Sequence, residues 1–439
     1  MMREPAFSLL HQPKPSSLKG KKVLVLGLGD TGLSVARWVE AQGGTVRAAD
    51  TRASPPRKRD FSGELHAGPF EAALLNGVDL VCISPGLSLE DEIVRRAVAN
   101  GTPVVGDVEL FAWENKAPVI AITGTNGKTT VTALTGHLLR TAGVDCEVAG
   151  NISPPVLDSF LSRAKPPSVW VLELSSYQLE TTWSLAPRAA TMLNLTEDHF
   201  DRYAGLEDYA AAKARVFMGE GLQVLNRDDP RSLGMALPGR KVVTFGLDAP
   251  RGDDFGVAGG KLVRGAKEIL PVEHLPIRGM HNVANALAAC ALVDVPLKGL
   301  KSFTGLPHRL ELVGVRGGKE WYDDSKGTNV GATVAALRGL GKKVVLILGG
   351  EGKGQDFTPL REPVREFAAH VLLIGRDAPL IARAVGGERC ASLEEAVQKA
   401  ARLSAEAVLL SPACASFDMF RDYKHRGDVF AAAVRALPA

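Results

Sequence analysis

A glycine-rich loop between a strand pattern and a helix pattern constrains this chain more than any other segment. Apolar, mostly β-branched residues at 119–123 lead into the loop at 124–127, and residues 128–139 then follow a helical pattern. Backbone N–H groups in such a loop can surround phosphate oxygens, and the N-terminus of the helix adds a partial positive charge. The segment therefore predicts a strand, a phosphate-binding loop and a helix.

Two side chains at the start of the predicted helix extend this interpretation. Lys128 can reach a terminal phosphate, and the Thr129 hydroxyl is placed to face a magnesium ion. The loop is a variant, because Ile122 stands where the common nucleotide-binding pattern begins with glycine. A glycine-rich turn with a solvated lysine is the alternative. The strand before the loop and the helix after it favour binding of ATP or GTP.

The length of 439 residues exceeds one ordinary hydrophobic core. We expect three domains, at residues 1–113, 114–305 and 306–439. The contents of 45% hydrophobic and 23% charged residues are typical of a soluble globular protein. A net charge of +3 is small for this length, so we expect no nucleic-acid partner and interpret the basic run at 57–59 as a solvated loop.

The five cysteines are widely spaced and lack the spacing of metal ligands. They predict reduced thiols in a cytoplasmic protein. The first residues lack the apolar run of a signal peptide, and no stretch reaches the roughly eighteen apolar residues that a membrane span requires. We therefore expect no membrane span, and we expect a monomer.

A second glycine loop lies nearer the N-terminus. A predicted strand at 22–26 leads into GLGDTG at 27–32, and the next predicted strand ends at Asp50. This is the dinucleotide-binding fingerprint, and alone it makes an NAD-dependent oxidoreductase the leading hypothesis. A further strand at 79–83 stops at the small residues 84–86, where a ligand can approach the backbone. We predict a small, doubly wound, Rossmann-like domain.

Acidic residues follow two predicted strands of the middle region. Glu173 lies at the carboxyl end of a strand at 168–174, where it can hold the magnesium ion of a nucleotide. Its alternative role is a buried pair with a basic residue. A later strand leads into residues 194–202, which combine His199 with three acids. A second metal or substrate-charge site and a surface turn explain this composition equally well.

Two predicted helices of the middle region carry polar residues whose role the sequence does not decide. Lys213 lies in an otherwise apolar stretch, where a lysine ordinarily extends its ammonium to water. Asn282 and Asn285 are one turn apart near the start of another helix. They could grip a base or a phosphate, or they could serve as helix caps.

Residues 306–309 break the pattern and predict a hinge to a third domain with another open parallel sheet. Its expected strands are 321–324, 343–348, 371–374 and 407–410, with a helix at 330–340. Glycines surround Lys353, and Arg309 and Lys326 add positive charge beside small residues. We favour an anion site there over a flexible hairpin with solvated lysines, because ligands of open sheets bind at strand ends.

Several motifs in this order resemble those of the Mur ligases, the ATP-dependent amide ligases of bacterial cell-wall precursor synthesis. They are GTNGKTT at 124–130, ELSSYQL at 173–179, LNLTEDHFDRY at 193–203, GMHNVANALAA at 279–289, LPHR at 306–309 and DDSKGTN at 323–329. Others look most like the member that adds D-glutamate to UDP-N-acetylmuramoyl-L-alanine. These are GLGDTGLS at 27–34, DTR at 50–52, GGEGKGQDF at 349–357 and SPACASFD at 411–418.

The resemblance implies an α/β fold of three domains: an N-terminal Rossmann-like domain, a central P-loop domain that binds ATP, and a C-terminal Rossmann-like domain that binds the amino acid. It also implies that the first domain holds the UDP end of the substrate instead of NAD. The implied reaction joins D-glutamate to the carboxylate of UDP-N-acetylmuramoyl-L-alanine through an acyl phosphate, in peptidoglycan precursor synthesis. Because the reactants are anionic, such a site needs concentrated positive charge.

By the same resemblance, Lys128 neutralises the transferred phosphoryl group. Thr129 and Glu173 hold one magnesium ion, and His199 helps to hold a second. Lys213 matches the position where most relatives carry a carbamylated lysine. An ammonium there would repel the metals, whereas a carbamate behaves as a carboxylate ligand.

The resemblance also implies contacts for each substrate. Those for ATP are Gly124, Thr125, Asn126, Gly127, Lys128, Thr129, Thr130, Asn282, Arg309 and Asp324. Those for the UDP-sugar are Thr31, Thr51, Arg52, Ser84, Gly86 and Asn151. Those for the incoming amino acid are Lys326, Thr328, Lys353, Ser416, Phe417 and Tyr423. One departure is Ser153, which stands where the family usually has glycine.

Two alternatives remain at this point. The first is another ligase of the same family, adding a different amino acid or acting on folate. The Asp-Asn-Pro-Arg signature of the diaminopimelate- or lysine-adding member is missing, which argues against that member. The second is a nicotinamide oxidoreductase that uses Gly27, Gly29, Gly32 and Asp50.

Overall fold

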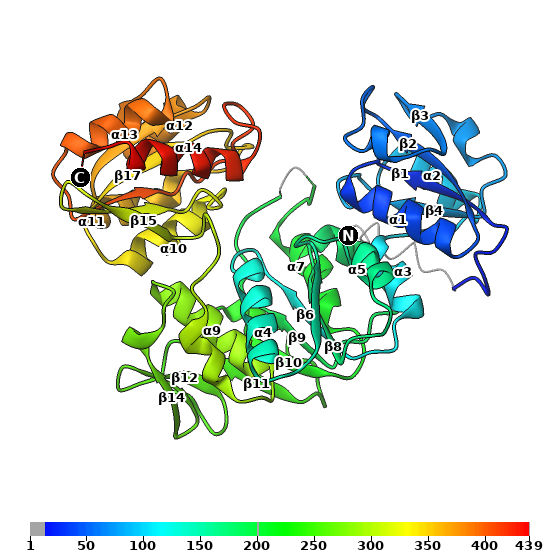
Figure 1. Ribbon diagram of the computed structural model, residues 1–439, viewed down its shortest axis with the longest axis horizontal. Helices are drawn as coiled ribbons and strands as arrows, with labels where there is room; N and C mark the ends of the chain where they lie inside the picture. The colour runs from blue at the N-terminus through cyan, green and yellow to red at the C-terminus, as the bar shows by residue number, and fades with distance from the viewer. Residues whose placement is uncertain (1–13, 200–201, 439) are drawn as a thin grey trace.

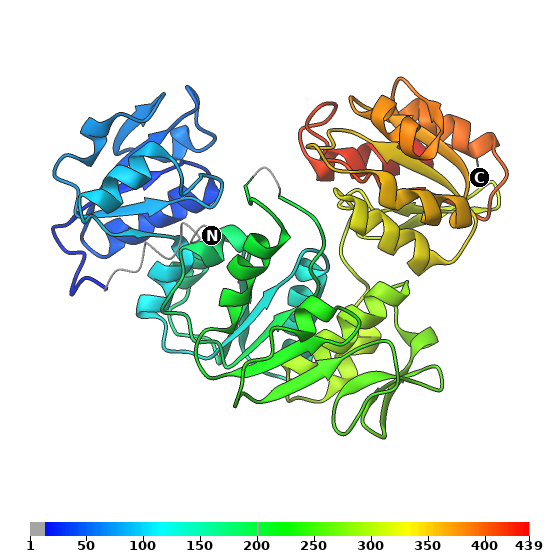
Figure 2. The same cartoon turned by 180° about the vertical axis from the view of Figure 1, so that it is seen from behind.

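Three α/β lobes form an arc, with the middle lobe between the N-terminal and C-terminal lobes (Figures 1 and 2). The structure is a computed structural model that describes residues 14–199 and 202–438. Phe200 and Asp201, part of the predicted acid and histidine turn, lie outside the described residues. Each lobe is built on its own sheet. The α/β fold with parallel sheets is confirmed.

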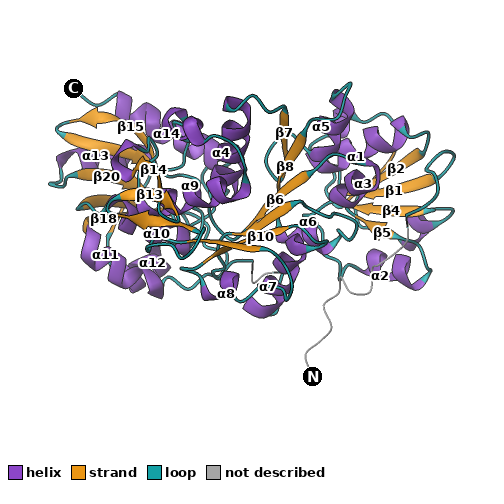
Figure 3. Ribbon diagram, turned by 90° about the horizontal axis from the view of Figure 1, so that it is seen from below, coloured by secondary structure: helices purple, strands orange, loops and turns teal. Residues whose placement is uncertain are grey.

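The N-terminal sheet has five parallel strands in the order β3-β2-β1-β4-β5. Figure 3 shows helices on both of its sides, with α1 and α2 on opposite faces. This is the predicted doubly wound arrangement, and it brings the strand ends to one edge. The elements are β1 (Lys22–Leu26), α1 (Asp30–Ala41), β2 (Thr45–Asp50), β3 (Glu64–Ala67), β4 (Leu80–Ile83), α2 (Glu92–Ala99) and β5 (Val104–Val105).

The middle sheet has nine strands in the order β14-β13-β12-β11-β10-β9-β6-β8-β7. Strands β6 to β12 are parallel, and β13 and β14 extend the edge as antiparallel hairpins. The phosphate loop joins β6 (Val119–Thr123) to α4 (Lys128–Thr141), as predicted. The other elements are β7 (Cys146–Gly150), α5 (Val156–Ser162), β8 (Val169–Glu173), α6 (Ser176–Glu180), β9 (Ala189–Met192), α7 (Leu206–Ala214), β10 (Leu222–Asn226), α8 (Pro230–Leu233), β11 (Val242–Phe245), β12 (Phe255–Ala258), β13 (Lys261–Arg264), β14 (Lys267–Pro271) and α9 (Met280–Leu292).

The C-terminal sheet has six strands in the order β15-β16-β20-β17-β18-β19. Its edge strand β15 runs antiparallel to β16, and the remaining pairs are parallel. The sequence analysis did not predict β15, because it expected a parallel sheet in which helices separate the strands. A short hairpin joins β15 to β16 without a helical crossover. The elements are β15 (Glu311–Arg316), β16 (Lys319–Asp323), α10 (Val330–Leu340), β17 (Val344–Gly349), α11 (Arg361–Phe367), β18 (Ala368–Ile374), α12 (Ala378–Val385), β19 (Glu388–Arg389), α13 (Leu393–Arg402), β20 (Ala407–Leu410) and α14 (Tyr423–Arg435).

Helix α3 (Asp107–Glu114) lies where we placed the crossing from the first domain to the second. The buried Glu109 carboxylate accepts hydrogen bonds from Trp113 Nε1 at 2.8 Å and from the backbone N of Trp183 at 2.6 Å and of Ser184 at 2.9 Å. These bonds tie the helix to the middle lobe. The exact domain boundaries stay predictions.

Candidate active site

The phosphate loop has a backbone that only glycine adopts easily. Gly124 has φ 153° and Gly127 has φ 84°. A Cβ on Gly124 would lie 2.9 Å from the Leu193 Cβ, and one on Gly127 would collide with Asn285 Oδ1. Close approach and backbone conformation both require these two glycines.

A neighbouring loop at the end of β9 holds the phosphate loop in place. Asn194 Oδ1 accepts the backbone N–H of Asn126 at 2.9 Å, and Asn194 Nδ2 donates to Asn126 O at 3.0 Å. The Thr125 hydroxyl accepts the backbone N–H of Thr196 at 3.1 Å. The loop is therefore fixed before any ligand arrives, which lowers the entropic cost of binding.

Lys128 curls back over this loop. Its Nζ donates to the carbonyls of Gly124 and Thr125, each at 2.9 Å. Burial lowers the pKa of its ammonium, while the negative charges of Glu173 and Asp198 act to raise it. The loop thus carries a cation where transferred negative charge needs one.

Glu173 ends β8 beside the loop and is only 2% exposed. Its Oε1 accepts a hydrogen bond from Asn151 Nδ2 at 2.8 Å. Its Oε2 has no hydrogen-bond partner among the described residues, although it is buried. A buried carboxylate oxygen left without a partner is costly unless a cation satisfies it. The donor set therefore fits a magnesium ion.

Lys213 is 1% exposed, so the prediction that its ammonium extends to water is wrong. The middle lobe folds over the helix and encloses this side chain. Its Nζ donates to Gly124 O at 2.9 Å and lies 4.6 Å above the Tyr209 ring. Burial, and then the charge of Lys128, hold the pKa of Lys213 well below its ordinary value. Both effects favour the neutral amine over the ammonium.

His199 lies in the loop after β9 with a left-handed backbone, φ 57°. Its Nδ1 lies 2.8 Å from the Tyr177 hydroxyl, and its Nε2 lies 3.7 Å from Asp198 Oδ2. Asp198 also acts electrostatically on Lys128 and Lys213. The histidine thus belongs to the neighbourhood of the phosphate loop.

A cavity of about 300 Å³ opens between the middle and C-terminal lobes. Its lining includes six of the residues predicted to hold ATP, which are Asn126, Gly127, Thr130, Asn282, Arg309 and Asp324, and also Lys326. Burial raises the pKa of Asp324 to about 7 and lowers that of Lys326 to about 8. Burial also lowers the pKa of Arg309, although the negative charge of Glu173 acts to raise it.

Several side chains of this cavity were not predicted as site residues, and four of them follow or end strands that the sequence did not predict. Asn226, Asp228, Phe245 and Leu247 line it from the ends of β10 and β11. If the sequence analysis had predicted β10 and β11, these four side chains would have been placed at the carboxyl ends of the strands, beside the phosphate loop. Phe245 and Leu247 supply the apolar surface that a planar base needs, and Asn226 and Asp228 supply polar groups.

The residues predicted to surround the incoming amino acid gather at the carboxyl end of the C-terminal sheet. Lys326 Nζ lies 4.2 Å from the centroid of the Tyr423 ring, and Lys353 Nζ lies 6.0 Å from that of Phe417. The Phe417 side chain is 65% exposed. A bridge between Glu351 and Ala415 joins the loop of Lys353 to that of Ser416. Thr328 lies on the same turn as Lys326, with its N–H bonded to Lys326 O at 2.8 Å.

The glycine loop of the N-terminal lobe gathers most of the predicted UDP-sugar residues. Thr31 lies in the first turn of α1, and the Ser84 hydroxyl donates to Gly27 O at 2.9 Å. Thr51 and Arg52 follow β2, and Gly86 follows β4. Asn151 follows β7 in the middle lobe, where it bonds to Glu173.

Asp50, the acid of the dinucleotide fingerprint, is already bound. Its Oδ1 accepts from Arg52 Nε at 2.8 Å, and its Oδ2 accepts from Arg52 Nη2 at 2.6 Å and from Leu28 N at 2.7 Å. Burial opposes ionisation, but the bonds from Arg52 and Leu28 prevail and lower the pKa of Asp50 to about 2. Both carboxylate oxygens that could accept a hydrogen bond from a ribose hydroxyl therefore already accept hydrogen bonds within the protein.

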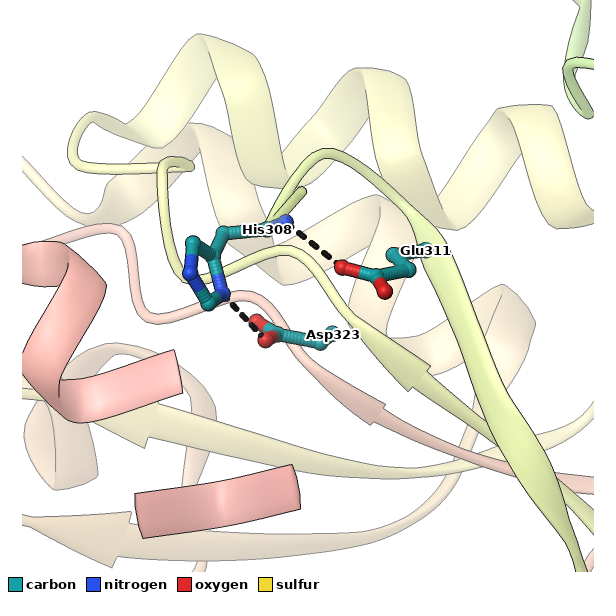
Figure 4. A group of neighbouring side chains, drawn as sticks. All are labelled: His308, Glu311 and Asp323. Atoms are coloured by element: carbon teal, nitrogen blue, oxygen red, sulfur yellow. Dashed lines mark hydrogen bonds and ion pairs between the residues drawn. The ribbon is translucent and has the colours of Figure 1, made fainter. Parts of the chain in front are cut away.

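At the hinge, His308, Glu311 and Asp323 converge (Figure 4). His308 Nδ1 lies 2.7 Å from Asp323 Oδ2, and the His308 backbone N donates to Glu311 Oε2 at 2.9 Å. The bond to Asp323 raises the pKa of His308. These two hydrogen bonds tie the hinge to the start of β15 and to the end of β16.

No helix among residues 14–199 and 202–438 has the length and apolar character needed to cross a membrane. Three family models match consecutive parts of the chain. They are "Mur ligase MurD-like, N-terminal domain" at residues 21–106, "Mur ligase middle domain" at 122–293, and "Mur ligase, glutamate ligase domain" at 308–414. Together they cover most of the described chain.

Curated relatives are similar over nearly the full length. A protein of Thiobacillus denitrificans is 53% identical over 96% of this chain and 98% of its own length. One of Nitrosospira multiformis is 52% identical over 96% and 97%. Both are named "UDP-N-acetylmuramoylalanine--D-glutamate ligase".

Solved structures share the fold at lower identity. The UDP-N-acetylmuramate-alanine ligase MurC of Thermotoga maritima has a TM-score of 0.61 at 21% identity, covering 94% of this chain and 99% of its own. A pseudomurein peptide ligase type C of Methanothermus fervidus has a TM-score of 0.58 at 20% identity, covering 89% and 96%.

Proposed function

Because this chain belongs to the Mur ligase family, we propose that it joins D-glutamate to UDP-N-acetylmuramoyl-L-alanine with hydrolysis of ATP. The observation that carries this function is the 53% identity, over 96% of the chain, to a relative named for that reaction. The chain is therefore an ATP-dependent amide-bond-forming ligase of peptidoglycan precursor synthesis. Its substrates are small molecules.

The reaction needs an activated carboxylate, because a carboxylate ion does not react usefully with an amine. The alanyl carboxylate oxygen attacks the γ-phosphorus of ATP, ADP leaves, and an acyl phosphate forms. The amine of D-glutamate then attacks the acyl carbon, phosphate leaves, and the nitrogen loses a proton. We assign Lys128 to the charge of the transferred phosphoryl group, because its Nζ lies over the phosphate loop.

We propose that Thr129 and Glu173 hold one magnesium ion, and that His199 helps to hold a second. The unpartnered Oε2 of Glu173 supports the first site. Hard oxygen ligands of this kind suit magnesium. When bound, magnesium neutralises phosphate charge and so lets the two anionic substrates approach.

We propose that Lys213 is carbamylated. Its neutral amine would attack carbon dioxide, an N–C bond would form, and the nitrogen would lose a proton. The lowered pKa and the enclosure of Lys213 support this step. The change replaces a cation beside Lys128 with an anion, which removes a repulsion and provides oxygen ligands.

For the two other substrates we keep the predicted residues. We assign the UDP-sugar to the glycine loop of the N-terminal lobe and to Asn151, and D-glutamate to Lys326, Thr328, Lys353, Ser416, Phe417 and Tyr423. Two lysines suit an amino acid with two carboxylates. The cytoplasmic location and the monomeric state stay predictions. The Asp50–Arg52 pair argues against the nicotinamide alternative, because it leaves no free carboxylate oxygen for a ribose.

A ligase assay tests the function directly. The purified chain is incubated with ATP, magnesium and UDP-N-acetylmuramoyl-L-alanine, and ADP release is measured with D-glutamate, L-glutamate, diaminopimelate or no amino acid. Release that depends on D-glutamate, together with the matching product mass, is expected. Equal release with another amino acid would point to a different family activity, and NADH turnover without ATP use would favour an oxidoreductase.

A further inference from the structure

Asn329 connects the C-terminal lobe to two loops of the middle lobe. It precedes α10 and is 6% exposed. Its Nδ2 donates to Asn126 Oδ1 in the phosphate loop at 3.2 Å and to Asp198 Oδ2, beside His199, at 3.3 Å. One amide group from the third domain therefore contacts both loops that carry the predicted phosphate and metal chemistry.

The orientation of this amide is fixed by the helix that it caps. Asn329 Oδ1 accepts the backbone N–H of Ala332 at 2.8 Å, which satisfies a free donor at the start of α10. Because the oxygen is committed to the cap, the NH₂ group must face the middle lobe. The assignment of oxygen and nitrogen thus follows from the partners: one donor on one side and two acceptors on the other.

Close packing supports the same junction. A Cβ on Gly331 would lie 3.1 Å from the Thr196 hydroxyl and 3.4 Å from Asn126 Nδ2. Gly331 and Ala332 also line the cavity between the lobes. The first turn of α10 therefore forms a wall of the nucleotide cavity, on the side of the C-terminal lobe that adjoins the middle lobe (Figure 1).

The turn before Asn329 carries side chains for two substrates. Asp324 and Lys326 line the nucleotide cavity, and Thr328 follows them. Lys326 N donates to His308 O at the hinge at 3.1 Å, and Gly327 N donates to Asp324 O at 2.7 Å. The turn is thus tied to the hinge at one end and to the middle lobe, through Asn329, at the other.

We propose that Asn329 is a positioning residue of the ligase reaction, which sets the turn at 324–329 over the phosphate loop by holding Asn126 and Asp198 together. This role rests on the proposed function. Asn329 acts through its neighbours and does not itself touch a substrate. Asn329 acts in the step in which the lobes come together. Its substitution should therefore lower kcat and leave the KM for the UDP substrate unchanged.

Two substitutions separate this role from helix capping. Asn329→Asp keeps the size and the cap but replaces the NH₂ donor with an anion that faces Asp198 and Asn126 Oδ1. Asn329→Ser also keeps a good cap, but its hydroxyl is too short to reach the two loops. Ser392→Asp is the matched control, because it adds the same charge at the cap of α13, on the far side of the same lobe (Figure 1).

We expect kcat to fall roughly 100-fold in Asn329→Asp and roughly tenfold in Asn329→Ser, since small misplacements of catalytic groups cost this much. The thermal midpoint of all three variants should match that of the wild type. The Ser392→Asp control should keep full kcat. Scattering with a non-hydrolysable ATP analogue and the UDP substrate should show less compaction for Asn329→Asp than for the wild type.

Wild-type kcat in Asn329→Asp would overturn the positioning role. So would a lowered thermal midpoint with equal losses in both Asn329 variants, because that pattern marks a purely structural residue. Failure of the proposed function is recognised separately, since the wild type itself would then show no ADP release that depends on D-glutamate.

Discussion

The two junctions between the three lobes are built differently. At the first, one hydrophobic cluster runs without interruption from Trp38 of α1 through Val108 of α3 to Leu157 of α5 and Trp170 of β8. At the second, the clusters of the C-terminal lobe contain residues of that lobe alone. There, Asn329 and the residues around the cavity make polar contacts instead.

This difference indicates which parts move. Burial of apolar area is roughly additive and expensive to reverse, whereas hydrogen bonds exchanged with water contribute little net free energy. The N-terminal and middle lobes should therefore behave as one body. The C-terminal lobe should swing about residues 306–309, and in doing so tighten the cavity that Arg309 and Asp324 already line.

The strongest test of the apolar junction is Trp38→Ala. Trp38 is fully buried in the shared cluster. Its loss should lower the free energy of unfolding by about 3–5 kcal/mol, because less apolar surface is buried and a cavity is left in the core. Urea denaturation measures this change. Asn329→Ser, at the polar junction, should change the same quantity by less than about 1 kcal/mol. Similar losses in both variants would erase the contrast between the junctions.

A second substitution probes the chemistry beside the polar junction. Lys213→Ala should lower kcat by roughly 10²–10³-fold, the cost of removing a group that arranges charge in an active site. Steady-state ADP release measures it, and a short carboxylic acid should restore part of the activity. The exposed Lys165→Ala serves as the control and should keep full activity. Full activity of Lys213→Ala would remove the carbamate from the mechanism.

A smaller effect concerns the hinge. Because Asp323 raises the pKa of His308 in the folded chain, their pair stabilises the fold fully below the ordinary histidine pKa of about 6.5. This stability should be lost as the pH rises through the folded pKa of His308, and the effect stays local to the hinge, where the side chains are 13% and 1% exposed.

Hydrogen exchange of β15 and β16 between about pH 6 and about pH 9 measures the effect at the hinge. His308→Gln should flatten the pH dependence, and the exposed His274→Gln should leave it unchanged. Protection in the wild type that does not fall with rising pH would contradict the ion pair.

The smallest expected change is in overall size. Binding of an ATP analogue and the UDP substrate should reduce the radius of gyration by roughly 1 Å from the ~22 Å expected for this length. Fluorescent labels can assign the motion, because the native cysteines are all buried. A Glu40→Cys and Glu220→Cys pair should keep its distance, and a Glu220→Cys and Arg402→Cys pair should shorten. A change in the first pair would show that the apolar junction also moves.

The sequence predicted the elements in which a continuous apolar run, or a helical period, is bounded by clear turn residues. Strands 22–26, 119–123 and 407–410 and helix 330–340 have the expected bounds. Strands β10 to β14 were missed, because each is only four or five residues long, and β12, β13 and β14 also carry glycine, lysine or glutamate. Asn226 and Phe245 of the cavity were missed with them.

In the site, too, the sequence predicted features that depend on neighbouring residues and missed those that depend on contacts between distant parts of the chain. The phosphate loop was predictable because its glycines and Lys128 follow one another in sequence. The burial of Lys213 was not predictable, since it depends on the loop at Gly124, far away in the chain. The bonds of Asn329 to Asn126 and Asp198 cross between domains and leave no mark in local patterns.

The Asp50–Arg52 pair bears on how such folds diverge. The glycine loop and the acid that dinucleotide enzymes use are both intact in the N-terminal lobe, and a single guanidinium covers the acid. Arg52 thus changes what the acid can accept while the backbone of the glycine loop stays the same. Protein engineers who wish to convert this lobe should therefore begin at position 52.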